Sequence, residues 1–190
     1  MNFIREGWIL DMKRYIKSVV SNILDEDLDT RREIAKDTHT SLDVLRTLMS
    51  DSDYQVRHKV ASNPNTTPDM LDVLVFDSSS WVRQSAAFQY KDKYTIPVDT
   101  LTKMANHADT YLRYTASQCD SLGIELLFSL LNDNCYDVSR TSRKTIKRLA
   151  EQTSTPVSTL EYIINHTSKY SYPDIHSVAK DTLTEVEGGV

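Results

Sequence analysis

The sequence predicts an all-α fold in which short helical hairpins stack on one another as repeats. Related residues recur along the chain at an offset of 26 positions. Within each recurrence the apolar residues follow helical spacing. With only 4 Gly and 5 Pro in 190 residues, the chain is neither collagen-like nor dominated by loops. A helical hairpin of this size cannot bury its apolar face alone, so neighbouring units must stack.

The repeat is clearest in the first half of the chain. One step of the offset superposes seven residues on similar ones: Arg31 on Arg57, Ile34 on Val60, Ala35 on Ala61, Asp37 on Asn63, Leu45 on Leu71, Leu48 on Leu74 and Asp51 on Asp77. The next step is interrupted by an insertion within residues 88–97, after which the register resumes at Leu101. We therefore predict about five units over residues 29–168.

Each unit is expected to hold two helices. In the clearest unit the first helix begins near Val56, and the polar segment from Asn63 to Pro68 ends it. Thr67 then stands as an N-cap with Pro68 at the first helical position, and the second helix runs on to about Asp77.

The two ends are expected to cap the stack. Residues 1–28 contain a long amphipathic pattern and are predicted to form an N-terminal capping helix, while residues 169–190 form a final helix with a flexible tail. We expect a single domain overall.

The segment VRHKVASNPNTTPDMLDVL, residues 56–74, resembles the leucine-rich repeat variant family. The wider spacing Asp-x-x-x-x-Val/Leu-Arg is similar to that of HEAT and related α-solenoid repeats. This resemblance covers roughly residues 29–168 and implies a right-handed α-solenoid with one concave surface, but no particular ligand. Some members of the variant family hold an iron-sulfur cluster on a cysteine-rich segment, which this sequence does not contain, so no cofactor is expected.

Charge and cysteine content limit the function classes. Lys and Arg number 22 against 27 Asp and Glu, so a formal charge of −5 argues against a protein that mainly coats nucleic acid or an anionic membrane. No stretch approaches the roughly 18 apolar residues of a membrane span, and the N-terminus lacks the apolar core of a secretory signal. Two cysteines, Cys119 and Cys135, suggest reduced thiols in a cytoplasmic protein.

Acidic and basic residues recur once per unit. Asp51 precedes Arg57 by six residues and Asp77 precedes Arg83 likewise, whereas later units place His107 before Arg113 and Asp133 before Ser139. A catalytic acid rarely recurs in every repeat. We interpret these residues as a structural ladder in which each carboxylate caps a helix start or meets an Arg of a neighbouring unit.

Five cations share one helical face and are called here the basic stripe: Arg140, Arg143, Lys144, Lys147 and Arg148. Their spacing of three or four residues places them opposite the apolar Val138, Ile146 and Leu149. The stripe is a candidate contact for phosphates or an acidic partner. The alternative is a solvated face, or one neutralised by the acidic run 25–27 of a neighbouring copy.

The insertion adds a second candidate surface. It is expected to lengthen a loop that carries the partner-binding candidates Tyr90, Lys91, Lys93 and Tyr94. The tyrosines could instead seal a widened gap between layers. Trp81 and Tyr111 occupy equivalent repeat positions and are expected to pack between layers.

No motif for metal binding, phosphate binding or nucleophilic catalysis is present in the sequence. We therefore predict a non-enzymatic module that binds or inhibits a partner protein through its helical-repeat surface. The alternatives are a solenoid that holds the nucleic-acid backbone, an acidic mimic of nucleic acid, and, by fold analogy alone, an enzyme similar to HEAT-like DNA glycosylases.

Overall fold

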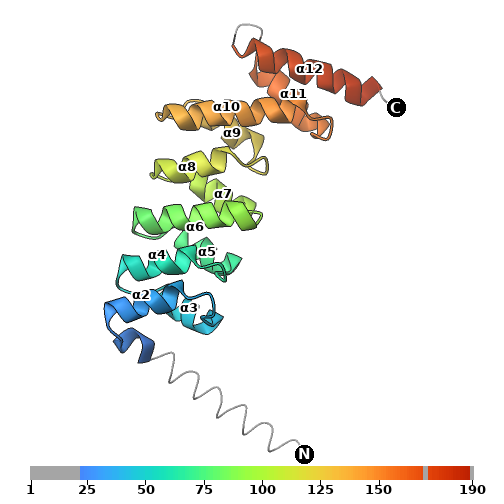
Figure 1. Cartoon of the computed structure of the whole chain (residues 1–190). Coiled ribbons are helices and arrows are strands. Elements are labelled where there is room, and N and C mark those ends of the chain that lie inside the picture. The colour runs from blue at the N-terminus through green and yellow to red at the C-terminus, as the bar shows by residue number, and fades with distance from the viewer. Residues whose placement is uncertain (1–21, 169–170, 189–190) are drawn as a thin grey trace, which may run out of the picture. The chain divides into compact units, whose positions relative to one another are not determined.

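The computed structural model describes residues 22–168 and 171–188, and this part of the chain is helical, with no strand. It holds a 3-10 turn and eleven α-helices (Figure 1). The predicted all-α class is confirmed for these residues. The expected N-terminal capping helix lies mostly in residues 1–21, outside the described residues.

The chain divides into two compact units, residues 1–95 and 96–190, where the sequence predicts a single domain. The boundary, between Thr95 and Ile96, falls within the 88–97 insertion that interrupts the repeat register.

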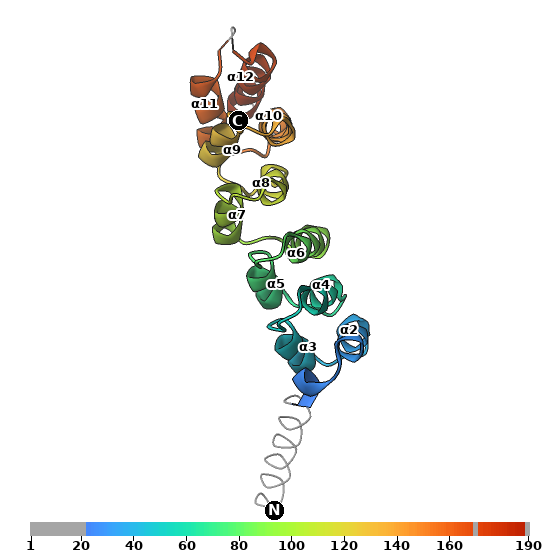
Figure 2. The same cartoon turned by 90° about the vertical axis from the view of Figure 1, so that its left-hand side faces the viewer.

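Unit 1 consists of η1 (Ile23–Asp25), α2 (Leu28–Lys36), α3 (Leu42–Leu48), α4 (Tyr54–Ser62), α5 (Pro68–Leu74) and α6 (Ser80–Lys93). Helix α4 packs between α2 and α6, and α3 and α5 form a second row beside them (Figure 2). The core residues predicted from the register are buried here: Val60, Leu71, Leu74 and Ala86. Thr67 is the N-cap of α5 with Pro68 next to it, although its hydroxyl makes no capping hydrogen bond.

Buried amides join successive hairpins of unit 1. The Asn63 side chain donates to the carbonyl oxygens of Ala35, at 2.8 Å, and Asp37, at 2.9 Å. The Gln89 amide in turn donates to the carbonyl oxygen of Asn63, one repeat earlier. Because a buried carbonyl left unpaired is costly, these bonds fix the step between the first helices of neighbouring hairpins.

Unit 2 consists of α7 (Val98–Ala105), α8 (Thr110–Ser117), α9 (Ile124–Leu130), α10 (Tyr136–Glu151), α11 (Val157–His166) and α12 (Pro173–Gly188). Helix α10 packs against α8, α9 and α12, and α11 packs against α12. Leu101, Leu127 and Leu130 are buried, as the register predicts. Helix α12 corresponds to the predicted C-terminal helix.

Candidate functional site

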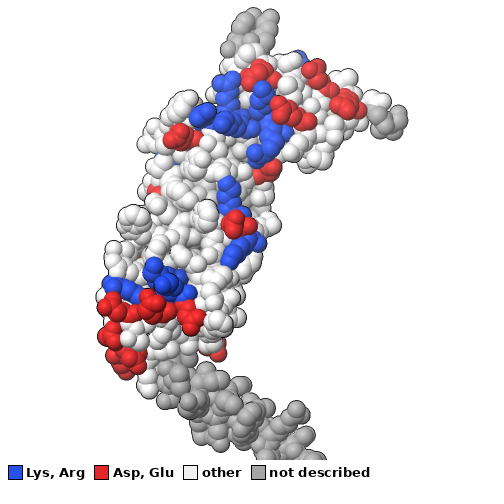
Figure 3. All heavy atoms as spheres, in the orientation of Figure 1, with Lys and Arg blue, Asp and Glu red and all other residues white. Residues whose placement is uncertain are grey.

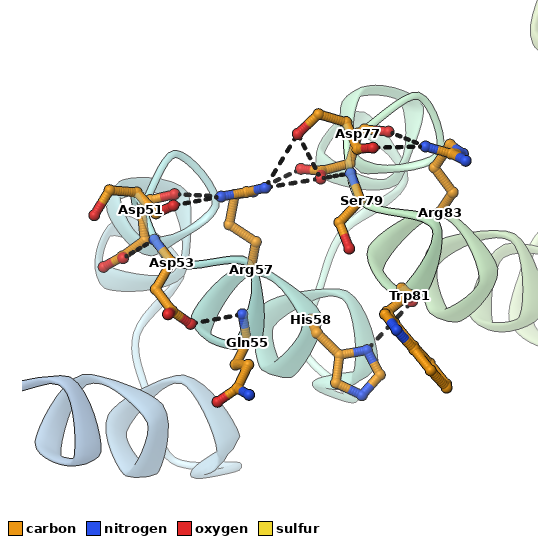
Figure 4. Close-up of polar contacts among 11 residues, drawn as sticks. Asp51, Asp53, Gln55, Arg57, His58, Asp77, Ser79, Trp81 and Arg83 are labelled. Atoms are coloured by element: carbon orange, nitrogen blue, oxygen red, sulfur yellow. Dashed lines mark hydrogen bonds and ion pairs between the residues drawn. The ribbon is translucent and has the colours of Figure 1, made fainter.

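Three Arg and Asp pairs join successive hairpins, and the two residues of each pair are 20 positions apart. Figure 4 shows the pair of Arg57 and Asp77. Arg57 donates two hydrogen bonds to the Asp77 carboxylate, from Nε at 2.7 Å and from Nη2 at 2.9 Å. The same pair forms between Arg31 and Asp51 at 2.8 Å, and in unit 2 between Arg113 and Asp133 at 2.6 Å. Sequence reasoning did not identify Arg31 and Asp133 as partners in these pairs, although the repeat offset carries Arg31 onto Arg57.

Each ladder residue also organises its own turn. The Asp77 carboxylate accepts a hydrogen bond from the Ser79 backbone N–H at 2.8 Å, and Arg83 donates to the carbonyl oxygen of Asp77 at 2.8 Å. Burial would raise the pKa of the Asp77 carboxyl, but the hydrogen bonds from Arg57 and Ser79 outweigh burial and hold that pKa below its ordinary value. The Asp77 carboxylate thus meets an Arg of the neighbouring hairpin, as one of the two predicted alternatives has it, and it orders the turn before α6, whose N-cap is Ser79.

At position 107 a histidine stands where the other hairpins have the ladder aspartate, and the turn keeps its hydrogen bonds. His107 Nδ1 accepts from the Asp109 backbone N–H at 2.9 Å, which is the role of the carboxylate in the other hairpins. Arg113 donates to the carbonyl oxygen of His107 at 2.9 Å, as Arg83 does to Asp77. The ladder side chains are therefore occupied in holding the hairpins together and are poor candidates for catalysis.

The basic stripe lies on α10 of unit 2, where acidic residues of other segments meet it. Arg143 and Lys147 both approach Asp174 of α12, at 3.0 and 3.7 Å, and the Arg143 guanidinium also lies over the Tyr172 ring. Arg148 is paired with Asp120. Only Arg140 and Lys144 of the stripe make no ion pair within the described part of the chain. Figure 3 shows acidic side chains beside the cations at α10.

The insertion does not form the expected loop, since it extends helix α6 to Lys93. Tyr90 is fully buried and its hydroxyl donates to Asp72 at 2.9 Å, so the expectation that Tyr90 contacts a partner is wrong. Tyr94 is half-buried and donates to the carbonyl oxygen of Thr66 at 3.3 Å. Lys91 and Lys93 are exposed, and Lys93 donates to the carbonyl oxygen of Pro64. The two tyrosines are packing residues because the longer helix turns them toward the α5 side.

Unit 1 instead exposes aromatic side chains on its first-row helices. Trp81 and Phe88 are 63% and 66% exposed, and they stand seven positions apart on α6, so they share one helical face. Tyr54, at the start of α4, is 41% exposed. We call these three residues the aromatic face. The expectation that Trp81 packs between layers is wrong, whereas Tyr111 is half-buried.

A surface pocket of about 280 Å³ lies beside the aromatic face. Six side chains from the first helices of three successive hairpins, α2, α4 and α6, line it: Arg32, Tyr54, Gln55, His58, Lys59 and Trp81. His58 Nδ1 lies 2.9 Å from Ser85 Oγ and 3.3 Å from the Trp81 carbonyl oxygen, which sets the imidazole beside the indole (Figure 4). One sequence signal pointed here: Trp81 aligns with the polar Gln55, so its position faces outward in the preceding unit.

Residues 22–168 and 171–188 offer neither a metal site nor a membrane-spanning helix. These residues contain no group of three or more His, Cys, Asp or Glu side chains placed to hold a metal ion. None of the helices among them combines the length and hydropathy that crossing a bilayer requires. Cys119 and Cys135 are free thiols, both half-buried.

Comparison with known proteins leaves the family open. No protein-family model and no curated protein matches the chain. Among solved structures, a crystal structure of an engineered protein is similar over 90% of this chain and 97% of its own, at 16% sequence identity and a TM-score of 0.46.

Proposed function

We propose that each unit is a short α-solenoid of the HEAT-like or leucine-rich repeat variant type, and that the chain is a non-enzymatic module that binds a partner protein. Two kinds of contact recur at the repeat offset and support the solenoid proposal: the Arg–Asp pairs of the ladder, and the hydrogen bonds from the amides of Asn63 and Gln89. Such units present a rigid surface on which binding residues are placed by the helices beneath them.

The aromatic face carries the functional proposal. A tryptophan and a phenylalanine that each expose about two thirds of their surface lose favourable burial unless a partner covers them. Trp and Tyr are also the residues that most often anchor protein interfaces. Helix α6, which bears both Trp81 and Phe88, is held by the hydrogen bonds of Gln89 and Tyr90, so little conformational freedom is lost when a partner binds.

Nucleic acid is the weaker alternative. Three of the five cations in the basic stripe are already paired with Asp174 or Asp120. Phosphate binding draws its affinity from several uncompensated cations acting together, and the net charge of −5 opposes it.

The test is affinity capture from a native host lysate, with and without nuclease, read by mass spectrometry. The bait is the intact chain, compared with the double variant Trp81→Ala/Phe88→Ala. The matched control is Val73→Ala, which shortens an equally exposed apolar side chain on α5, in the other row of unit 1. We expect protein partners that resist nuclease, that the double variant loses and that the control retains.

Partners that survive the double variant would contradict the proposal. Capture that disappears with nuclease, and with Arg140→Glu/Lys144→Glu, would establish the nucleic-acid alternative instead. Urea unfolding of each variant shows whether the double variant is folded, and a loss of capture counts only if its unfolding curve matches that of the control.

A further inference from the structure

We propose that the pocket between α2, α4 and α6 recognises an aspartate or glutamate side chain in an acidic segment of the partner protein. This inference rests on the proposed function, because it assigns a chemistry to the pocket that adjoins the aromatic face. The ligand is an acidic residue of the partner that stands beside an apolar residue. Its carboxylate lies in the pocket, and the apolar side chain packs on Trp81 or Phe88.

The lining has one sign of charge. Arg32 and Lys59 are cations, His58 and Gln55 are polar, and no acidic residue lines the pocket. Lys59 makes no ion pair within the described residues. On a chain of net charge −5 this is a local positive site, and the partner chemistry that complements it is anionic.

Arg32 has spare capacity for an anion. Its Nη1 bonds to Asp29 at 2.8 Å, but Asp29 is 88% exposed, and exposed pairs of this kind are weak. A guanidinium carries five N–H donors, and the contact with Asp29 uses Nη1. The Nε of Arg32 is buried, so a carboxylate would bind through the remaining N–H groups of Nη1 and Nη2 while Arg32 keeps the contact with Asp29.

The pocket is the right size for a side chain. Its volume of about 280 Å³ falls just below the range of about 300 to 1,000 Å³ that is usual for sites of small molecules and cofactors. Tyr54 and Trp81 form apolar walls on one side of the site. A partner that covers these two side chains would exclude water there and so strengthen a charged hydrogen bond to Arg32 or Lys59. This space is large enough to admit a carboxylate side chain.

The experiment selects a displayed library of random peptides on the full chain. The background is Trp8→Phe, which leaves Trp81 as the sole tryptophan of the two in the sequence. The pocket variant is Arg32→Gln/Lys59→Gln. The matched control is Lys36→Gln/Arg46→Gln, which removes the same charge from α2 and α3 at residues outside the pocket. Selected peptides are then synthesised and titrated, with Trp81 fluorescence as the readout.

We expect enrichment of peptides with Asp or Glu next to an apolar residue. Their affinity should fall at least about tenfold in the pocket variant, and by less than about threefold in the control, because only the pocket cations contact the carboxylate. Replacing the acid of a selected peptide by its amide should cause the same loss as the pocket variant.

Three results would overturn the inference: no enrichment of acidic peptides, equal binding to the pocket variant, or binding at least about tenfold tighter when phosphoserine replaces the acid, which would assign the pocket to phosphate. In the first two cases the proposed function still stands if capture depends on Trp81 and Phe88. If capture does not depend on them, the proposed function fails independently.

Discussion

At the scale of single residues, the stability of the fold is expected to depend on the charges of the ladder pairs. Arg57 and Asp77 expose only 12% and 10% of their side chains, so each depends on the other for compensation. The repeat predicted that these residues act in structure, and it included contact with an Arg of a neighbouring unit among the possibilities. The structure adds which residues pair: Arg57 reaches the carboxylate of Asp77 in the next hairpin and the backbone carbonyl oxygen of Asp51, six residues before it.

Asp77→Asn is expected to lower the free energy of unfolding by about 1 to 3 kcal/mol, because it leaves the largely buried Arg57 guanidinium without its anion. Urea unfolding at neutral pH measures the effect. Asp43→Asn, an exposed acid on α3, is the control and should change stability by less than about 0.5 kcal/mol. Equal effects from the two substitutions would show that the ladder does not stabilise the fold.

The same pairs predict a loss of stability in acid. Hydrogen bonds from the partner arginines help to lower the pKa of both Asp77 and Asp133 in the folded chain from the ordinary 3.8. The unfolded chain therefore takes up protons first as pH falls, and the contribution of each pair, complete at neutral pH, is lost below about pH 4. Urea unfolding from pH 7 to pH 3 should show a smaller decline for Asp77→Asn/Asp133→Asn than for the unchanged chain. Parallel declines would contradict this account.

At the scale of helices, the apolar register was predictable and the outward surface was not. Leu71 and Leu74 recur at the repeat offset and are buried, because stacking requires an apolar residue at those positions. Trp81 also recurs as an aromatic position with Tyr111, but repeat spacing gives the face of a helix and not the depth to which a neighbour covers it. The pairing of α10 with Asp174 joins segments 31 residues apart, outside the repeat, so no periodic signal marks it.

Leu74→Ala tests the packing of α5. It removes a fully buried side chain and leaves a cavity, so the free energy of unfolding should fall by about 2 to 5 kcal/mol. The adjacent Val73 is 58% exposed, and Val73→Ala should change stability by less than about 0.5 kcal/mol. A change as small for Leu74 as for Val73, measured by denaturant unfolding, would show that the register is misplaced.

Because α12 contacts α10, two cations of the basic stripe, Arg143 and Lys147, pair with Asp174, whereas Arg140 and Lys144 do not. Arg143→Glu/Lys147→Glu places two acids against Asp174, so α12 should open more often and its amides should exchange hydrogen faster. Arg140→Glu/Lys144→Glu alters the same charge on the same helix without facing an acid, and α12 exchange should stay as it is. Equal exchange in both variants would indicate a stripe that is fully solvated.

At the scale of the whole molecule, an acidic chain carries a small positive pocket and an aromatic face on unit 1, while the basic stripe of unit 2 is largely paired internally. Composition alone predicts that nucleic acid is a poor partner, and the internal ion pairs of the basic stripe favour the same prediction. The location of the proposed binding surface depends on which side chains three separate helices leave uncovered, and that information exists only in the folded unit.

The most direct measurement of the central claim is amide hydrogen exchange of the full chain, alone and with the captured partner protein at saturation. We expect protection of α4 and α6, whose helices carry Tyr54, Trp81 and Phe88, and no change in α5, which carries Val73 on the other row. Protection confined to α10, or spread over no part of α4 and α6, would contradict the assignment of the binding surface to the aromatic face.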